Sequence, residues 1–165
     1  MKLLIAYAGK TGSAAEMAAL LAKHIPNHEL TVCNLAESAP DPAAFDYVVL
    51  GASIRYNRVQ KPLRAYIDAH REVLCAMPHT LFLCCAFPDQ LEHYFAVAFP
   101  RELRESAESM EYFGGDLSLS RQRGIDKIIT RMLRNSILEG EEDGLVLPTL
   151  LPEHVRLLAD RLRKK

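Results

Sequence analysis

The chain has 165 residues, the usual length of one domain, and 49% of them are hydrophobic, enough for a core of its own. Its 20 basic and 21 acidic residues leave a formal net charge of -1, which excludes binding to nucleic acid or acidic membranes through overall charge. We therefore expect a single domain over residues 1–165 with no nucleic-acid partner.

Cysteine usage and the start of the chain bear on location. The four cysteines lack the spacing of a metal site, and adjacent Cys84 and Cys85 point to opposite faces of a predicted strand, which favours packing over a redox pair. The apolar start of the chain is too short for a signal peptide or a membrane span. We expect reduced thiols, no metal and a cytoplasmic protein.

Apolar runs alternate with helical periodicity in the first half of the chain. Lys2–Tyr7 is predicted to be a strand, and Ala14–Ile25 a helix that Pro26 ends. Leu30–Leu35 is a second short strand. Tyr47–Ser53 is apolar almost throughout, as in a strand covered on both faces. Strands that alternate with helices predict an α/β fold with a parallel sheet.

The second half continues this alternation. A proline near the first turn opens a predicted helix over Pro62–Met77, and Thr80–Phe87 is a fourth strand. Leu91–Ser109 has helical character but Pro100 should break it. The remaining predicted elements are one strand and two helices: Tyr112–Leu119, Ile125–Leu138 and Pro152–Lys165.

A glycine-bearing turn follows the first strand, where a parallel sheet binds its ligands. Backbone N–H groups at the start of the next helix converge on an anion there, and glycine permits a close approach. We expect this turn to hold a phosphate through Gly9, Lys10, Thr11, Gly12, Ser13 and Ala14. The alternative is a tight turn without a ligand, in which Thr11 or Ser13 caps the helix.

This turn resembles the phosphate loop of the flavodoxin family, Ser/Thr-x-Thr-Gly-x-Thr. Gly9 and Ala14 replace two hydroxyl residues of that pattern. The resemblance implies a flavodoxin-like, doubly wound sheet of five parallel strands in the order 2-1-3-4-5, with helices on both faces. It also implies FMN as the cofactor, held at its phosphate more by backbone N–H groups than by hydroxyls.

Two further loops are expected to contact the flavin. Gly51-Ala52-Ser53-Ile54-Arg55-Tyr56 closely resembles a loop of the menaquinone-dependent protoporphyrinogen oxidases, flavodoxin-like FMN enzymes, as do Tyr112–Leu117 and the order of the later elements. The resemblance implies ring contacts from the third-strand loop (Ser53, Ile54, Arg55 and Tyr56) and the fourth-strand loop (Ala86, Phe87, Pro88 and Asp89). Alternatively, Tyr56 packs on a helix and Asp89 caps one.

The expected function is that of an FMN oxidoreductase, which passes electrons from an organic reductant to a quinone or another acceptor. The segment between the fourth-strand loop and Met110 differs from the subgroup, whose members carry a strongly basic insertion there. The resemblance therefore does not assign protoporphyrinogen as the substrate. A flavodoxin-type electron carrier and an FMN-free binding module are the alternatives.

A basic stripe on the predicted helix near Lys127–Arg134 bears on partners. Lys127, Arg131 and Arg134 share the side opposite its apolar stripe. Such a stripe is commonly a solvated face, and the alternative is contact with an anionic partner or the surface of a membrane. A homodimer is the oligomeric state that we consider.

Overall fold

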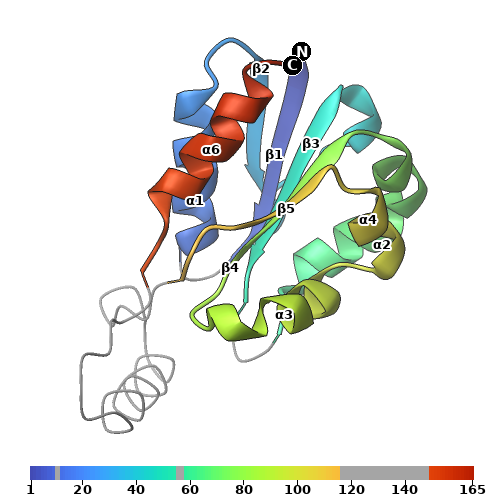
Figure 1. Ribbon diagram of the computed structural model, residues 1–165. Helices are drawn as coiled ribbons and strands as arrows, with labels where there is room; N and C mark the ends of the chain where they lie inside the picture. Colours follow the sequence, from blue (N-terminus) through green and yellow to red (C-terminus); the bar gives the residue numbers. More distant parts are fainter. Residues whose placement is uncertain (10–11, 55–57, 116–148) are drawn as a thin grey trace, which may run out of the picture.

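The computed structural model describes residues 1–9, 12–54, 58–115 and 149–165. Within these ranges, five parallel strands form one sheet in the order β2-β1-β3-β4-β5 (Figure 1). The strands are β1 (Lys2–Ala8), β2 (Glu29–Asn34), β3 (Tyr47–Ser53), β4 (His79–Cys84) and β5 (Ser109–Tyr112). The helices are α1 (Ser13–His24), α2 (Lys61–Ala76), α3 (Leu91–Ala98), α4 (Arg101–Ser106) and α6 (Pro152–Leu162), with short 3-10 helices η1 (Pro42–Ala44) and η2 (Pro88–Gln90). The predicted strand order is confirmed.

The central strands are buried on both faces, which explains their continuous apolar runs. Alternate residues enter different cores: Leu3 and Ile5 of β1 belong to one hydrophobic cluster, and Leu4 and Ala6 to the other. Helices α1 and α6 cover the first cluster, and α2, α3 and α4 cover the second (Figure 1). The prediction of helices on both faces is therefore confirmed.

The last strand differs from the prediction. We expected a strand over residues 112–119, whereas β5 covers Ser109–Tyr112 and pairs with β4 from Thr80 to Leu83. As an edge strand, β5 is only half-buried and carries no apolar run that marks its start. After β5 the chain turns at Gly114, whose φ is +81°, and pairs with Leu150. Residues 116–119 lie outside the described residues.

Other element boundaries also move slightly. The break at Pro100 is confirmed, because α3 ends two residues before it and α4 begins directly after it. Strand β4 ends at Cys84, so Phe87, predicted to lie in the strand, belongs to the following loop. Helix α6 ends at Leu162, short of the predicted Lys165. The predicted helix over residues 125–138 lies outside the described ranges.

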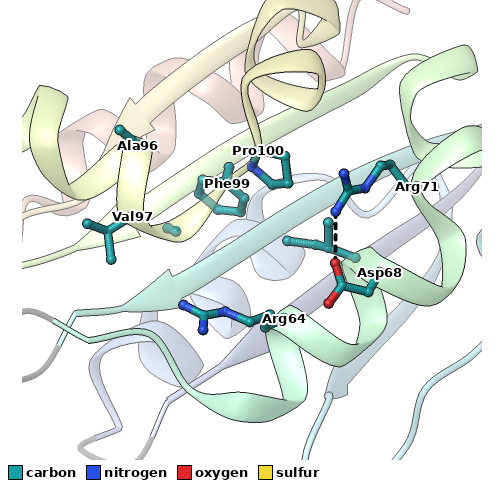
Figure 2. A pocket seen from close by; sticks show the side chains of 9 residues that line it. Arg64, Asp68, Arg71, Ala96, Val97, Phe99 and Pro100 are labelled. Atoms are coloured by element: carbon teal, nitrogen blue, oxygen red, sulfur yellow. Dashed lines mark hydrogen bonds and ion pairs between the residues drawn. The ribbon is translucent and has the colours of Figure 1, made fainter.

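The helices on the α2 side leave a hollow between them. Its volume is about 270 Å³, and its lining comes from α2, from α3 and from the turn between α3 and α4 (Figure 2). The charged side chains on its α2 wall include an ion pair in which Arg71 Nη2 lies 2.9 Å from Asp68 Oδ1. The hollow is thus lined by helices and not by the loops at the strand ends.

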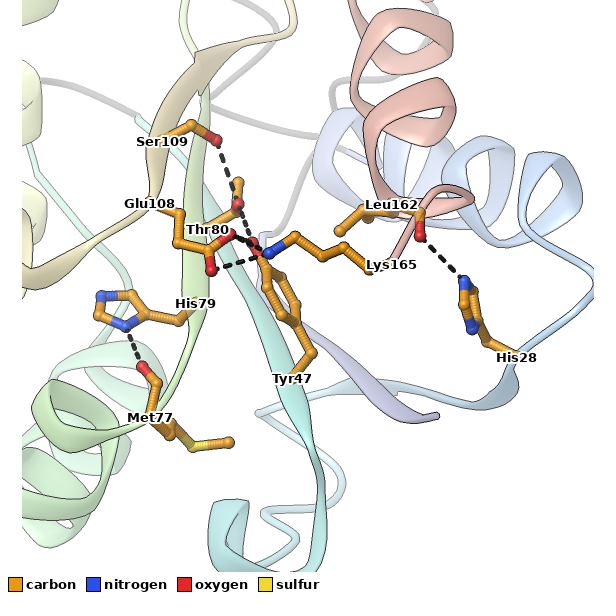
Figure 3. A network of polar contacts seen from close by, with 9 residues as sticks. All are labelled: His28, Tyr47, Met77, His79, Thr80, Glu108, Ser109, Leu162 and Lys165. Carbon is orange, nitrogen blue, oxygen red and sulfur yellow. Dashed lines mark hydrogen bonds and ion pairs between the residues drawn. The ribbon is translucent and has the colours of Figure 1, made fainter.

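A network of polar contacts lies at the amino ends of the strands (Figure 3). The Tyr47 hydroxyl donates to Glu108 Oε2 at 2.9 Å, so the Thr80 hydroxyl, 2.8 Å away, donates to the phenol oxygen. Lys165 Nζ lies 2.6 Å from the same carboxylate and holds the pKa of Glu108 below its ordinary value. Burial raises the pKa of Tyr47, which therefore stays a donor. The network links the amino ends of β3, β4 and β5 to Lys165. The predicted ligand loops lie at the opposite, carboxyl ends of the strands.

Candidate functional site

The direction of the connections reverses at the carboxyl ends of β1 and β3. These strands pair directly, with Ala8 opposite Ala52. The chain leaves β1 toward α1 on one face of the sheet and leaves β3 toward α2 on the other (Figure 1). A doubly wound sheet binds its ligand in the crevice at such a reversal point.

The start of α1 presents backbone donors at this point. Gly12 precedes the helix with a left-handed φ of +87° and provides no side-chain cap. Of the N–H groups at the helix start, that of Ala14 is bonded, and those of Gly12, Ser13 and Ala15 have no acceptor among the described residues. Together with the helix dipole, such N–H groups attract an anion.

Ser53, at the end of β3, takes part in this start. Its Oγ accepts from the Ala14 N–H at 3.2 Å, and the side chain is buried. A Cβ at Gly9 would lie 3.0 Å from that Oγ and 3.3 Å from the Ala14 Cβ, so glycine leaves room for the contact. Ser53 therefore fixes the first turn of α1 against the neighbouring strand.

Two loops flank the turn along the same edge. The Ile54 N–H donates to the Cys84 carbonyl at 2.9 Å, which continues the pairing of β3 and β4 one residue beyond β3. Ile54 and Phe87 are half-buried and pack against the core on the α2 side. An apolar surface of this kind suits one face of a planar ring.

The exit from β5 explains the glycine pair in the sequence. The Cys85 N–H donates to the Gly114 carbonyl at 2.9 Å. A Cβ at Gly115 would lie 2.0 Å from the Cys85 carbonyl oxygen, and one at Gly114 would lie 2.2 Å from the Thr149 carbonyl oxygen. The two glycines thus let the chain pass between the end of β4 and the returning segment beside the predicted site.

Comparison with known proteins identifies the family. The flavodoxin domain family matches residues 4–144. This chain belongs to the flavodoxin family. Proteins of that family bind FMN, so the predicted cofactor is confirmed at the level of the family. That one flavodoxin domain fills residues 1–165 stays a prediction.

Solved structures with a similar fold have low sequence identity to this flavodoxin domain. An apo NADH:FMN oxidoreductase has a TM-score of 0.52 at 11% identity, covering 87% of this chain and 92% of its own. A short-chain flavodoxin associated with a bacterial microcompartment has a TM-score of 0.51 at 12% identity, covering 85% and 98%. Oxidised flavodoxin 1 from Bacillus cereus has a TM-score of 0.49 at 17% identity, covering 86% and 100%. Among curated proteins no match was found. The two neighbours with TM-scores of 0.52 and 0.51 are only 11% and 12% identical to this chain, so their likeness shows the fold alone.

The predicted site residues divide into three groups. The structure brings Gly9, Gly12, Ser13, Ala14 and Ser53 together at the start of α1. It also places loop residues beyond the ends of β3 and β4: Ile54, Ala86, Phe87, Pro88 and Asp89. Lys10, Thr11, Arg55 and Tyr56 lie outside the described residues. The assignment of all of these residues to FMN stays a prediction.

Ser13 and Asp89 are candidate helix caps in the alternative interpretations of the two loops. Ser13 is the first residue inside α1 and does not cap it. Asp89 lies within η2, and neither η2 nor α3 has a side-chain cap. Ser13 and Asp89 therefore do not cap these helices, and the oxygen that caps α1 among the described residues comes from Ser53. Thr11 lies outside the described residues, so a turn without a ligand stays an alternative. Sequence reasoning assigned Ser53 only to the flavin loop, because no local pattern relates it to Ala14.

The cysteines of the flavodoxin domain are packed within it. Cys84 and Cys85 enter opposite hydrophobic clusters, as predicted from their adjacent positions in a strand. Burial raises the pKa of Cys84, and it raises the pKa of Cys85 to about 11, so both thiols are protonated at neutral pH. All four cysteines are free.

Neither a metal-binding cluster nor a membrane-spanning helix is found in the described part of the chain. No group of three or more His, Cys, Asp or Glu side chains is arranged there to hold a metal ion. None of the helices found there is both long and apolar enough to cross a membrane.

Proposed function

We propose that this flavodoxin domain binds FMN and works as an oxidoreductase that passes electrons from an organic reductant to a quinone or another acceptor. The observation that carries the proposal is the start of α1, where N–H groups without acceptors among the described residues meet the reversal point of the sheet. When bound, FMN supplies the redox chemistry. The protein then has to hold the phosphate and the ring.

The described residues fit that group. The N–H groups of Gly12, Ser13 and Ala15 would donate to the phosphate, and the left-handed Gly12 keeps a side chain out of their way. Ile54 and Phe87 would provide apolar contact on the ring side. By burying the ring edge, they would exclude water from it.

Resemblance in sequence supports the finer part of the proposal. Gly51–Tyr56 and the Gly114–Gly115 pair resemble the menaquinone-dependent protoporphyrinogen oxidases, which supports a relation to that subgroup. A balance of 20 basic and 21 acidic residues supports an enzyme over a carrier, because carriers of this type are usually strongly acidic for docking. Because the segment up to Met110 departs from the subgroup, we propose an organic reductant and do not assign protoporphyrinogen as the substrate.

The first experiment compares FMN with riboflavin, which lacks the phosphate. Absorbance and fluorescence titrations should give an FMN affinity about a hundredfold higher than that for riboflavin, since charge-assisted bonds to the phosphate are lost with riboflavin. Gly12→Val should remove most of this difference, because its side chain would occupy the approach to the N–H groups. Gly12→Ala is the milder variant if the valine protein fails to fold. A folded variant with unchanged preference for FMN contradicts the assignment of the turn.

The second experiment separates enzyme, carrier and binding module. The FMN-loaded protein is reduced anaerobically and offered either a quinone or a one-electron acceptor protein. Faster reoxidation by the quinone supports the oxidoreductase, and a preference for the acceptor protein supports the carrier. A purified protein that is colourless and ignores added FMN leaves only the FMN-free module.

We also propose a cytoplasmic location with contact to the membrane surface through the basic helix near Lys127–Arg134. That helix lies outside the described residues, and its support is the spacing of its basic residues in the sequence. Sedimentation with anionic vesicles, but not with neutral ones, is the expected result. Equal recovery in both supernatants contradicts it. A homodimer stays a proposal that light scattering tests.

A further inference from the structure

The hollow between α2 and the α3–α4 turn joins a cationic wall to an apolar one (Figure 2). Arg64 and Arg71 extend from the α2 wall, on either side of Asp68. Val97, Phe99 and Pro100 lie across from them.

The charges on the α2 wall do not cancel. Asp68 is paired with Arg71, with 2.9 Å between Oδ1 and Nη2. Arg64 is exposed and has no carboxylate partner among the described residues. One guanidinium at the rim is therefore available to an anion, and its planar fork suits a carboxylate or sulfonate.

The opposite wall and the floor are apolar. Ile67 and Phe99 are each about 1% exposed and belong to the core on the α2 side. Val97 and Pro100 are half-buried at the edge of the hollow. A ligand body placed here would cover the exposed apolar parts of Val97 and Pro100, beside a floor that is already buried.

We propose that this hollow binds a small amphiphilic organic anion, whose acidic group lies on Arg64 and whose ring system lies against Val97 and Pro100. The volume of about 270 Å³ is just below the range of roughly 300–1,000 Å³ for small-molecule pockets, which limits the ligand to one or two rings. The site is separate from the turn at the start of α1 and does not depend on FMN.

A pair of fluorescent probes tests the charge and the apolar wall independently. Naphthalene-2-sulfonate is a two-ring amphiphilic anion, and naphthalene-2-sulfonamide is an uncharged probe with the same ring system. The full chain without FMN should bind the sulfonated probe at one site, and binding should weaken as salt is added. The uncharged probe should bind more weakly and without salt dependence.

Three variants locate the site. Arg64→Gln should weaken binding of the sulfonated probe by about fivefold and leave the uncharged probe unaffected. Ala96→Glu adds a carboxylate at an exposed position of the lining, so it should weaken the sulfonated probe without harming the fold. Arg156→Gln is the matched control, because it removes an exposed arginine from α6 on the other face of the sheet and should change nothing.

Each outcome decides the proposal. Loss of the sulfonated probe in Arg64→Gln but not in Arg156→Gln supports it. Equal affinities in all variants, or equal binding of the two probes, overturns it. The titration is then repeated with saturating FMN. An unchanged affinity keeps the hollow separate from the FMN site, whereas competition moves the probe to the turn at α1 and overturns the proposal.

Discussion

Gly12 and Gly114 have nearly the same backbone conformation but different surroundings. Their φ values are +87° and +81°, both in the left-handed region. At Gly12, apart from its chain neighbours, no heavy atom among the described residues lies within 4 Å of an added Cβ. At Gly114 an added Cβ would lie 2.2 Å from the Thr149 carbonyl oxygen and 2.8 Å from the Leu151 nitrogen. Substituting alanine at each site therefore separates backbone strain from steric overlap.

The two losses of unfolding free energy follow from these surroundings. Left-handed strain costs an alanine about 1–2 kcal/mol at either position. Overlap with packed backbone adds about 1–3 kcal/mol at Gly114 only, because the neighbouring atoms cannot rotate away as a side chain would. We expect a loss of about 1–2 kcal/mol for Gly12→Ala and about 2–5 kcal/mol for Gly114→Ala.

Urea denaturation of the FMN-free protein, followed by circular dichroism, measures both losses. Asparagine is the control, because it tolerates the left-handed region better than alanine. Gly12→Asn should recover part of the loss at position 12, whereas Gly114→Asn should recover nothing, because its Cβ still overlaps the returning chain. Equal losses for the two alanine variants, or rescue at Gly114 by asparagine, would refute the reasoning.

Three further predictions concern the core and the amino ends of the strands. Lys165 lowers the pKa of Glu108, so the Glu108 carboxylate stabilises the fold at pH values above its unfolded pKa of about 4.3. This stabilisation is lost as the pH falls through the folded pKa. Urea titrations at several pH values should therefore show that the stability advantage over Glu108→Gln shrinks on acidification. With a pKa of about 11, Cys85 should react roughly 300-fold more slowly at pH 7 than an ordinary thiol, as thiol-reagent kinetics with a Cys85→Ala comparison will measure. Phe113→Ala deletes a fully buried ring and should cost about 3–5 kcal/mol in the same denaturation assay, and a loss below 1 kcal/mol would contradict its place in the core.

Much of the fold could be predicted because the central strands carry their environment in their composition. Tyr47–Ser53 was predicted with its observed bounds, since a strand covered on both faces has to be apolar along its whole length. Pro100 marked the break between α3 and α4 for an equally local reason, the loss of a backbone donor. Strand β5 was misplaced, because an edge strand is half-exposed and its start shows no such run.

The candidate site was predictable in position and less so in detail. That the turn after β1 would lie at the reversal point followed from the order of strands and helices, so Gly9–Ala14 could be proposed from the sequence. The oxygen that caps α1 could not be identified in this way. Ser53 lies 39 residues from Ala14, and the two meet only because β3 pairs beside β1 in one register.

The sequence by itself determined the α/β class, the central strands and the turn after β1. Hydrophobic periodicity and the conformational freedom of glycine depend only on a few neighbouring residues, so both can be recognised in the sequence. Only the tertiary structure decided which groups meet at the carboxyl ends of the strands. Pairing of Ala8 with Ala52 brings Ser53 to Ala14, and the close approach of residues 149–151 leaves no room for a Cβ at Gly114. At Gly12 no such neighbour lies within 4 Å among the described residues. Such contacts depend on strand order and register, which no local pattern encodes.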